Sequence, residues 1–321
     1  RTFSSAASDV YKRQKLYWLF GFVGLYWAYC LYWGIKGARS AKTSTDYFLA
    51  GGSIGVWVFV LAATATSFSG WTFVGHPGKI FTDGLPYAFA SFYALTIPLT
   101  GVLFLRRQWV LGKAYGYITP GEMYSDYYGG NSIRLLTVLV AFLFSVPYLG
   151  VQLRASGDLF NVLTDGLISV DVGMFALSTV VMIYVASGGL KSVAFVDCAQ
   201  AILLAVGIMI LGGVTLNYLG GWSSFTTGLA DLVRSDIESG NNLTLDGFSK
   251  KVAIPGSIQM VSQGSDSIGG SWTGIMCMTY MFALMGIQSS PAFSMWAFSN
   301  KTSQAFRWQQ VFASALFIGV L

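Results

Sequence analysis

The feature that most constrains this chain is a series of long apolar stretches with almost no charge. About 20 apolar helical residues span the hydrocarbon core of a bilayer, and the sequence supplies eight such stretches, counting one that begins near Phe306 and runs to Leu321. A helix of a soluble core is polar on one side, whereas these are apolar nearly all round. We therefore expect an all-α, polytopic membrane protein. The predicted spans are 16–33, 55–74, 85–105, 135–153, 167–186, 193–216, 272–297 and 306–321.

Composition excludes several other classes of protein. Only 10% of the 321 residues are charged, compared with about 25% in soluble domains, and the net charge of +5 is too sparsely carried for a nucleic-acid binder. The three cysteines lack the spacing of a metal or redox site, and the single histidine, His76, excludes a multi-histidine site. The apolar stretches hold no paired carboxylates and no nucleophile–base spacing. We expect neither an enzyme nor a cofactor.

Positive charge predicts the orientation in the membrane, because short inner loops are rich in Lys and Arg. With the first span entering from outside, ten basic residues fall in the inner loops and four in the outer loops. The N-terminal group of Arg1, Lys12, Arg13 and Lys15 is the contrary evidence, and most of it belongs to the suspected tail. The N-terminus is therefore predicted to lie outside, in a multi-pass protein of the plasma (inner) membrane. The inner set is Lys36, Arg39, Lys42, Arg106, Arg107, Lys113, Arg134, Lys191, Lys301 and Arg307; the outer set is Lys79, Arg234, Lys250 and Lys251.

Two polar regions flank the predicted spans. Residues 1–14 (RTFSSAASDVYKRQ) lack an initiator Met and resemble a translated adapter sequence, so we expect a non-native tail before a single membrane domain at 15–321. The outer loop 217–271 contains apolar residues at helical spacing, which predicts one short amphipathic helix, either a lid over the outer face or a spacer. These apolar residues are Phe225, Leu229, Leu232, Val233 and Ile237.

The second span is unusual because hydroxyl residues and glycine crowd its centre, in the sequence LAATATSFSGWTFVGHPG at 61–78. Such residues allow a helix to open and leave carbonyls free, which a membrane tolerates only around a cavity or inside protein. Close helix packing through small residues is the alternative. The seventh span has a similar Gly/Pro-interrupted centre, MGIQSSPAF at 285–293. Two interrupted helices in two halves of a chain are typical of a transporter binding site near the midplane.

Several motifs resemble the sodium:solute symporter family. They are DYFLAG (46–51), SFSGWTFVGHPG (67–78), TPGEMY (119–124), PYLGVQL (147–153) and SGGLKSVAFVDCAQAILL (187–204). The family includes sodium-coupled carriers of proline, sugars, acetate, pantothenate and iodide. The resemblance implies the LeuT-type fold, with two inverted five-helix repeats after one extra helix, here the N-terminal portion of a member. The extra helix would be 16–33, the first repeat 55–216, and the start of the second repeat 272–321.

The resemblance also implies where ligands bind. Sodium, the coupling ion, would be bound by the backbone carbonyls of Ala65 and Phe68, and a hard cation prefers such oxygen ligands. Asp197 matches an aspartate of the inner sodium pathway; its alternative role is a charge at a helix start. Positions that match substrate and gating residues are Ser67, Ser69, Gly70, Trp71, Tyr148, Gln288, Ser289 and Ser290. The alternative role of Tyr148 is that of an aromatic residue at the membrane interface.

Three further charged or titratable side chains lie in or near the predicted spans. Arg154 is either a snorkelling end residue or a substrate clamp, and His76 either a structural or a proton-coupling residue. Asp171 is expected at the interface.

The sequence also departs from the family pattern at two positions. Gly52 stands where many members have an arginine linked with coupling, and Ser67 stands where proline carriers have an aspartate.

The predicted function is a secondary active transporter that couples sodium influx to uptake of a small organic solute by alternating access. The alternative is a symporter-like sensory input domain of a membrane histidine kinase. In the family, further sodium ligands come from a helix two spans after the seventh. We therefore expect residues 1–321 to hold half of the sodium site and not to transport by themselves.

Overall fold

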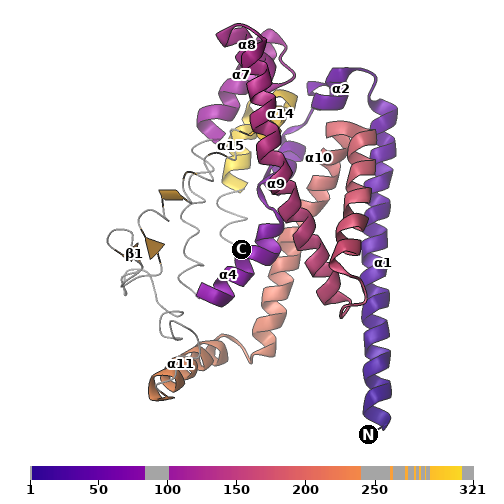
Figure 1. Cartoon of the computed structure of the whole chain (residues 1–321), viewed down its shortest axis with the longest axis vertical. Helices are drawn as coiled ribbons and strands as arrows, with labels where there is room; N and C mark the ends of the chain where they lie inside the picture. Colours follow the sequence, from indigo (N-terminus) through magenta and orange to yellow (C-terminus); the bar gives the residue numbers. More distant parts are fainter. Residues whose placement is uncertain are drawn as a thin grey trace.

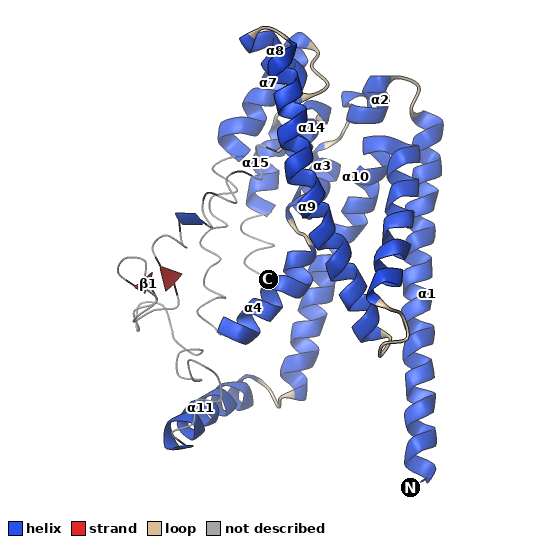
Figure 2. Cartoon of the chain, in the orientation of Figure 1, coloured by secondary structure: helices blue, strands red, loops and turns tan. Residues whose placement is uncertain are grey.

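The computed structural model describes residues 2–83, 101–239 and 290–312, together with positions 261–262, 272–273, 278–279, 282 and 286. Helices make up nearly all of this part of the chain (Figure 2). The two strands, β1 (Val261–Ser262) and β2 (Trp272–Thr273), have two residues each and pair in parallel. The predicted all-α class is confirmed.

The first helix is much longer than predicted. Helix α1 (Thr2–Ser40) has 39 residues, which corresponds to about 58 Å, because the polar residues before Leu16 continue the same helix as the predicted span 16–33. Its apolar part lies beside helix α10 (Val170–Tyr218), as Figure 1 shows. Shared core residues hold the two helices together: Cys30 from α1 and Val180, Tyr184 and Val196 from α10 are all buried in one cluster.

The second predicted span is a broken helix. Helix α3 (Val56–Ser67) ends where Phe68 takes extended backbone angles, and the chain continues as the π-helical turn η2 (Trp71–Gly75) and helix α4 (His76–Asp83). The two parts meet at an angle of 56°. The interruption expected from the Ser/Thr/Gly-rich centre is therefore present, and the helix does not run straight through on small-residue packing.

The fourth, fifth and sixth predicted spans lie in two long helices. Helix α9 (Asn131–Leu163) contains the fourth. Helix α10 has 49 residues and contains both the fifth and the sixth, with non-helical angles at Gly189 (φ 57°, ψ −159°). Its two halves lie side by side after a sharp turn (Figure 1). Ser192 Oγ donates to the Tyr184 carbonyl oxygen at 3.0 Å, although eight residues separate the two, so the turn is tight.

Short helices gather at one end of the molecule, where Figure 1 labels α2, α7 and α8. They are α2 (Ser44–Leu49), the 3-10 turn η1 (Ala50–Gly52), η4 (Gly101–Leu105), α7 (Arg106–Tyr115) and α8 (Pro120–Tyr128). Capping boxes explain two of the sequence motifs, because Thr43 pairs with Asp46 at the start of α2 and Thr119 with Glu122 at the start of α8. Hydrogen bonding to Thr43 lowers the pKa of the Asp46 carboxyl.

Helices α14 (Pro291–Ser299) and α15 (Gln304–Val311) complete the core. Phe293 and Trp296 of α14 and Phe306 of α15 are buried against Phe59 and Val60 of α3. A backbone bridge ties α14 to the start of α3, since Ile54 N donates to the Ser299 oxygen at 3.2 Å and Lys301 N to the Ile54 oxygen at 3.0 Å.

Helix α11 (Trp222–Ser239) lies at the end opposite α8 (Figure 1), where the sequence predicts an amphipathic helix. The described residues contain three helices long and apolar enough to cross a membrane, or four with the bent pair, and α10 counts once among them despite its turn. Most of the third predicted span, parts of the seventh and the end of the eighth lie outside the described residues. Apolar side chains cover the exposed surface of α9, as membrane-spanning helices require.

Candidate functional site

The break in the second span opens the last turn of α3. The final carbonyls of a helix have no intrahelical partner, and the extended backbone at Phe68 stops the next turn from supplying one. Phe68 N donates to the Ala65 oxygen at 3.0 Å, which leaves a second lone pair on that carbonyl. Ala65 and Phe68, the residues expected to bind sodium through their carbonyls, both line the adjoining cavities.

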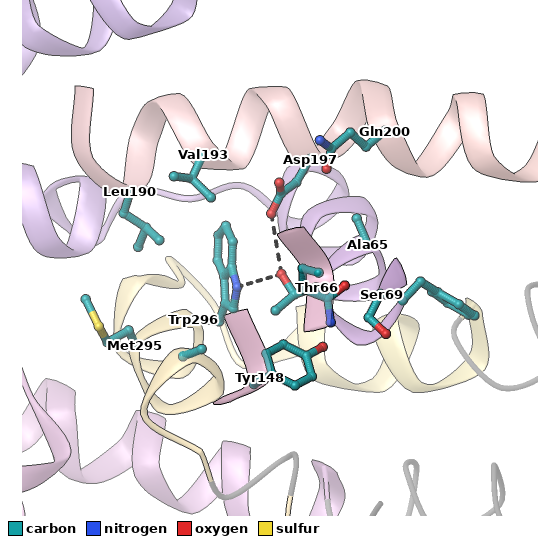
Figure 3. A pocket seen from close by; sticks show the side chains of 13 residues that line it. Ala65, Thr66, Ser69, Tyr148, Leu190, Val193, Asp197, Gln200, Met295 and Trp296 are labelled. Carbon is teal, nitrogen blue, oxygen red and sulfur yellow. Dashed lines mark hydrogen bonds between the residues drawn. The ribbon is translucent and has the colours of Figure 1, made fainter. Parts of the chain in front are cut away.

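Two neighbouring cavities surround the break. The first, of about 390 Å³, lies between α3, α9, α10 and α14, and Figure 3 shows the side chains that line it. The second, of about 620 Å³, extends along α9 and α10 and includes Gly70 of the break and Tyr26 of α1. Five residues line both: Ala65, Phe68, Ser69, Gln152 and Gln200. The break thus lies where the two cavities adjoin.

Asp197 is the one charged side chain among the described residues that line the cavities. It stands eight residues beyond the Gly189 turn, so it lies about 12 Å along its helix. That depth disagrees with the alternative role of a charge at the helix start. Figure 3 shows its carboxylate directed toward Thr66.

The carboxylate of Asp197 has few hydrogen-bond donors. Thr66 Oγ1 lies 3.4 Å from Asp197 Oδ2 and 2.9 Å from the Ala62 carbonyl oxygen. A hydroxyl has a single hydrogen to donate, and the shorter contact goes to Ala62. Trp296 Nε1 donates to Thr66 Oγ1 at 3.1 Å and so fixes the hydroxyl. None of the ion pairs of the described residues involves Asp197. A membrane carboxylate in this position is costly unless a cation joins it.

Side chains cap the second half of the broken helix. The amide of Gly70 donates to Gln152 Oε1, and the amide of Trp71 donates to Ser69 Oγ at 3.2 Å. A Cβ on residue 70 would lie 2.8 Å from the Ala155 Cβ, so only glycine fits there. Gln152 of α9 is therefore a structural partner of the break as well as a cavity residue.

The structure brings some of the predicted substrate and gating residues together. Ser69 and Tyr148 line the first cavity and Gly70 the second. Ser67 is not among the residues that line either cavity. Its hydroxyl instead donates to the Ala63 carbonyl oxygen at 3.1 Å. Trp71 packs over Gly75 and is not among the residues that line either cavity. Gln288 and Ser289 lie outside the described residues.

Three other candidates lie apart from the cavities. Ser290 is the N-cap residue of α14. Arg154 Nε pairs with Asp158 Oδ2 at 3.1 Å, one turn along the exposed face of α9, which disagrees with a substrate clamp. Asp171 lies in the first turn of α10, as expected for an interfacial charge.

Sequence reasoning missed four polar residues of the site: Thr66 as the partner of Asp197, and Gln152, Gln200 and Trp296. Two signals were present in the sequence. Gln152 is the polar residue inside the motif PYLGVQL, and Gln200 follows Asp197 by three residues, on the same helix face.

Comparison with known proteins shows what this chain is similar to. The sodium:solute symporter family matches residues 47–288. Solute carrier family 5 member 4B of Mus musculus is 28% identical, over 63% of this chain and 30% of that protein. The sodium/proline symporter of Escherichia coli K12 is 28% identical, over 57% of this chain and 37% of that protein. The sodium/glucose cotransporter 1 of Oryctolagus cuniculus is 28% identical, over 62% of this chain and 30% of that protein. The chain spans about a third of the length of these relatives.

A solved structure gives the same result for the fold. A Na⁺-coupled sialic acid symporter, in its substrate-bound outward-open state, superimposes with a TM-score of 0.70 at 18% identity, over 94% of this chain and 58% of that one. The predicted transporter fold is confirmed. The relatives named above are carriers, and none of them favours the sensory input domain. Members of the matched family are multi-pass membrane transporters that use sodium, and the chain belongs to the sodium:solute symporter family.

Proposed function

We propose that the chain provides the first repeat of a carrier that couples sodium influx to uptake of a small organic solute by alternating access. One observation carries the proposal: Asp197, a carboxylate without a cationic partner among the described residues, shares a cavity with the open carbonyl end of α3. Such a cavity favours a small hard cation.

The proposed sodium ligands are the carbonyl oxygens of Ala65 and Phe68, with Asp197 on the path that the ion follows. Two carbonyls are fewer than the five or six oxygens that a hard cation prefers. The remaining oxygens would come from other parts of the protein, as in the half-site expected from the resemblance. Sodium bound here offsets the negative charge of Asp197 and stabilises the state in which α3 and α10 stay close.

The proposed solute site lies beside the sodium site. A volume of about 390 Å³ is within the range of small-molecule pockets, about 300–1,000 Å³. Polar groups of Ser69, Tyr148 and Gln152 line one side, and apolar groups of Leu190 and Met295 line another. This mixture suits a small solute with several hydrogen-bonding groups. Proline, glucose and sialic acid, the solutes named for the relatives, define the first panel to test.

The proposed orientation places α2, α7 and α8 in the cytoplasm and the N-terminus outside, in the plasma (inner) membrane. Support comes from the ten basic residues assigned to the inner side against four in the outer loops, with the N-terminal group of Arg1, Lys12, Arg13 and Lys15 as the contrary evidence. Single cysteines between Arg106 and Arg134 in a cysteine-free background would then react with an impermeant thiol reagent only after the membrane is permeabilised. Reaction in intact cells would contradict the orientation.

Uptake into membrane vesicles tests the function. The full-length protein is reconstituted and given an inward sodium gradient with radiolabelled proline, glucose, sialic acid and other small solutes. We expect one solute to accumulate with sodium and not with choline in its place. Accumulation that is equal in both media, or that ends only when a proton gradient is collapsed, would contradict sodium coupling.

A further inference from the structure

Helix α1 lies outside both repeats in chain order, yet it is firmly joined to the second half of α10. Tyr29 donates its hydroxyl hydrogen to the Phe195 carbonyl oxygen at 2.9 Å. The Trp33 ring stacks on the Phe195 ring, with centroids 4.0 Å apart and planes 5° apart. These contacts fix α1 beside the helix half that carries Asp197.

One turn before Tyr29, α1 reaches the cavity itself. Tyr26 lines the cavity of about 620 Å³. Its hydroxyl oxygen accepts a hydrogen bond from Gln200 Nε2. Gln200 lines both cavities, and Figure 3 shows it on the same helix as Asp197, beside that residue. The extra helix therefore provides part of the cavity wall and contacts one of its two glutamines.

The bond to Tyr26 determines which end of the Gln200 amide is available. Nε2 is engaged by Tyr26, so Oε1, on the opposite edge of the amide, is the free group, and among the described residues no donor bonds to it. An amide oxygen is an acceptor only. Because residues three apart lie on one helix face, this acceptor stands next to the Asp197 carboxylate.

We infer that Tyr26 is a positioning residue for solute binding: it holds Gln200 so that Oε1 accepts a hydrogen bond from a hydroxyl or amine group of the solute. The inference rests on the proposed transport function and adds a residue from outside the two repeats to the solute site. Without the Tyr26 hydroxyl the amide rotates freely and loses its preferred acceptor orientation.

Two matched phenylalanine variants test this. Tyr26→Phe removes the hydroxyl that holds Gln200, and Tyr29→Phe removes an equivalent bond between the same two helices away from the cavity. We expect Tyr26→Phe to raise the solute KM about fivefold with kcat retained, as the loss of one net hydrogen bond predicts. Tyr29→Phe should leave KM unchanged. An unchanged KM in Tyr26→Phe, or an equal rise in both variants, would overturn the inference.

A double-mutant cycle separates positioning from a direct contact. If Tyr26 acts through Gln200, the combination of Tyr26→Phe with Gln200→Leu should have the KM of Gln200→Leu alone. Additive effects of the two substitutions would show that Tyr26 does not act through Gln200.

A labelling experiment is independent of transport. In a background without Cys30, Cys198 and Cys277, Tyr26→Cys should react with a charged thiosulfonate in permeabilised membranes at least tenfold faster than Tyr29→Cys. Equal rates would place Tyr26 outside an aqueous cavity and overturn the inference. Wild-type protein that shows no sodium-driven uptake of any solute would contradict the proposed function but would not alter the labelling result.

Discussion

Two interruptions of membrane helices differ in one physical respect. Both the break after α3 and the turn within α10 are built from serine and glycine, as SFSG at 67–70 and SGG at 187–189. At the turn, both glycines pack against protein: a Cβ on Gly189 would overlap the Tyr47 carbonyl, and one on Gly188 would lie 2.9 Å from the Gly34 oxygen. At the break, Ser69 and Gly70 face cavities.

The difference shows that a small-residue motif is not by itself a binding site. Ser192 is fully buried and its hydroxyl has two backbone acceptors, Tyr184 and Gly189. The Ser192 hydroxyl at the turn therefore bonds to backbone and is not offered to a ligand. At the break, the end of α3 and the Asp197 carboxylate line one cavity, so a ligand there can reach both.

The largest expected effect is a loss of fold stability from a substitution in the turn within α10. Gly189→Ala places a Cβ on Tyr47 and a non-glycine residue at φ 57°, ψ −159°, so strain and overpacking together should destabilise the fold by about 3 kcal/mol or more. We expect little monodisperse protein after detergent extraction, by fluorescence-detected gel filtration.

Gly207→Ala is the control for this substitution, because Gly207 is on the same helix with open space around it. It should be neutral or stabilising by up to about 1 kcal/mol. Normal yield of Gly189→Ala would show that the turn has room and is not sealed.

The next largest expected effect is a loss of uptake from a substitution at the break after α3. Gly70→Leu fills the space against Ala155 and disturbs the Gln152 bond, so sodium-driven uptake should be lost while the folded protein remains extractable. The measurement is uptake normalised to protein in the membrane, with Gly150→Leu, on an open face of α9, as the control. Uptake kinetics like wild type would mean that this stretch does not line the site.

The smallest expected effect is a slight loss of stability from a substitution beside the turn within α10. The Tyr47 hydroxyl bonds to the carbonyl oxygens of Val185 and Ala186, at 3.2 and 3.0 Å. Tyr47→Phe should cost about 1 kcal/mol and lower the unfolding temperature by a few degrees, with unchanged solute KM. A change in KM without a change in unfolding temperature would argue that the turn takes part in transport.

The sequence predicted the spans and the break for local reasons. Apolar runs of bilayer length and a cluster of Thr, Ser and Gly before Pro77 are properties of neighbouring residues, so they are readable without a fold. The long form of α1 was missed because polar residues 2–14 give no apolar signal, although they continue the same helix.

The hydrogen-bond partners within the site could not be predicted from the sequence, for a physical reason. The bond between Gly70 and Gln152 joins residues 82 apart, and the one between Tyr26 and Gln200 joins residues 174 apart. Local pattern does not encode which long-range partners meet. Ser67 shows the reverse error: its position beside the break suggested a ligand role, but its hydroxyl bonds back to its own helix.

The most direct test of the central claim is the sodium dependence of uptake in Asp197→Asn. If the carboxylate lies on the sodium path, the variant should need about tenfold more sodium for half-maximal uptake, the effect of roughly 1.4 kcal/mol. Solute KM at saturating sodium should change much less. Asp171→Asn, in the exposed first turn of α10, is the control. Equal sodium dependence in Asp197→Asn and wild type would contradict a role for this cavity in sodium coupling.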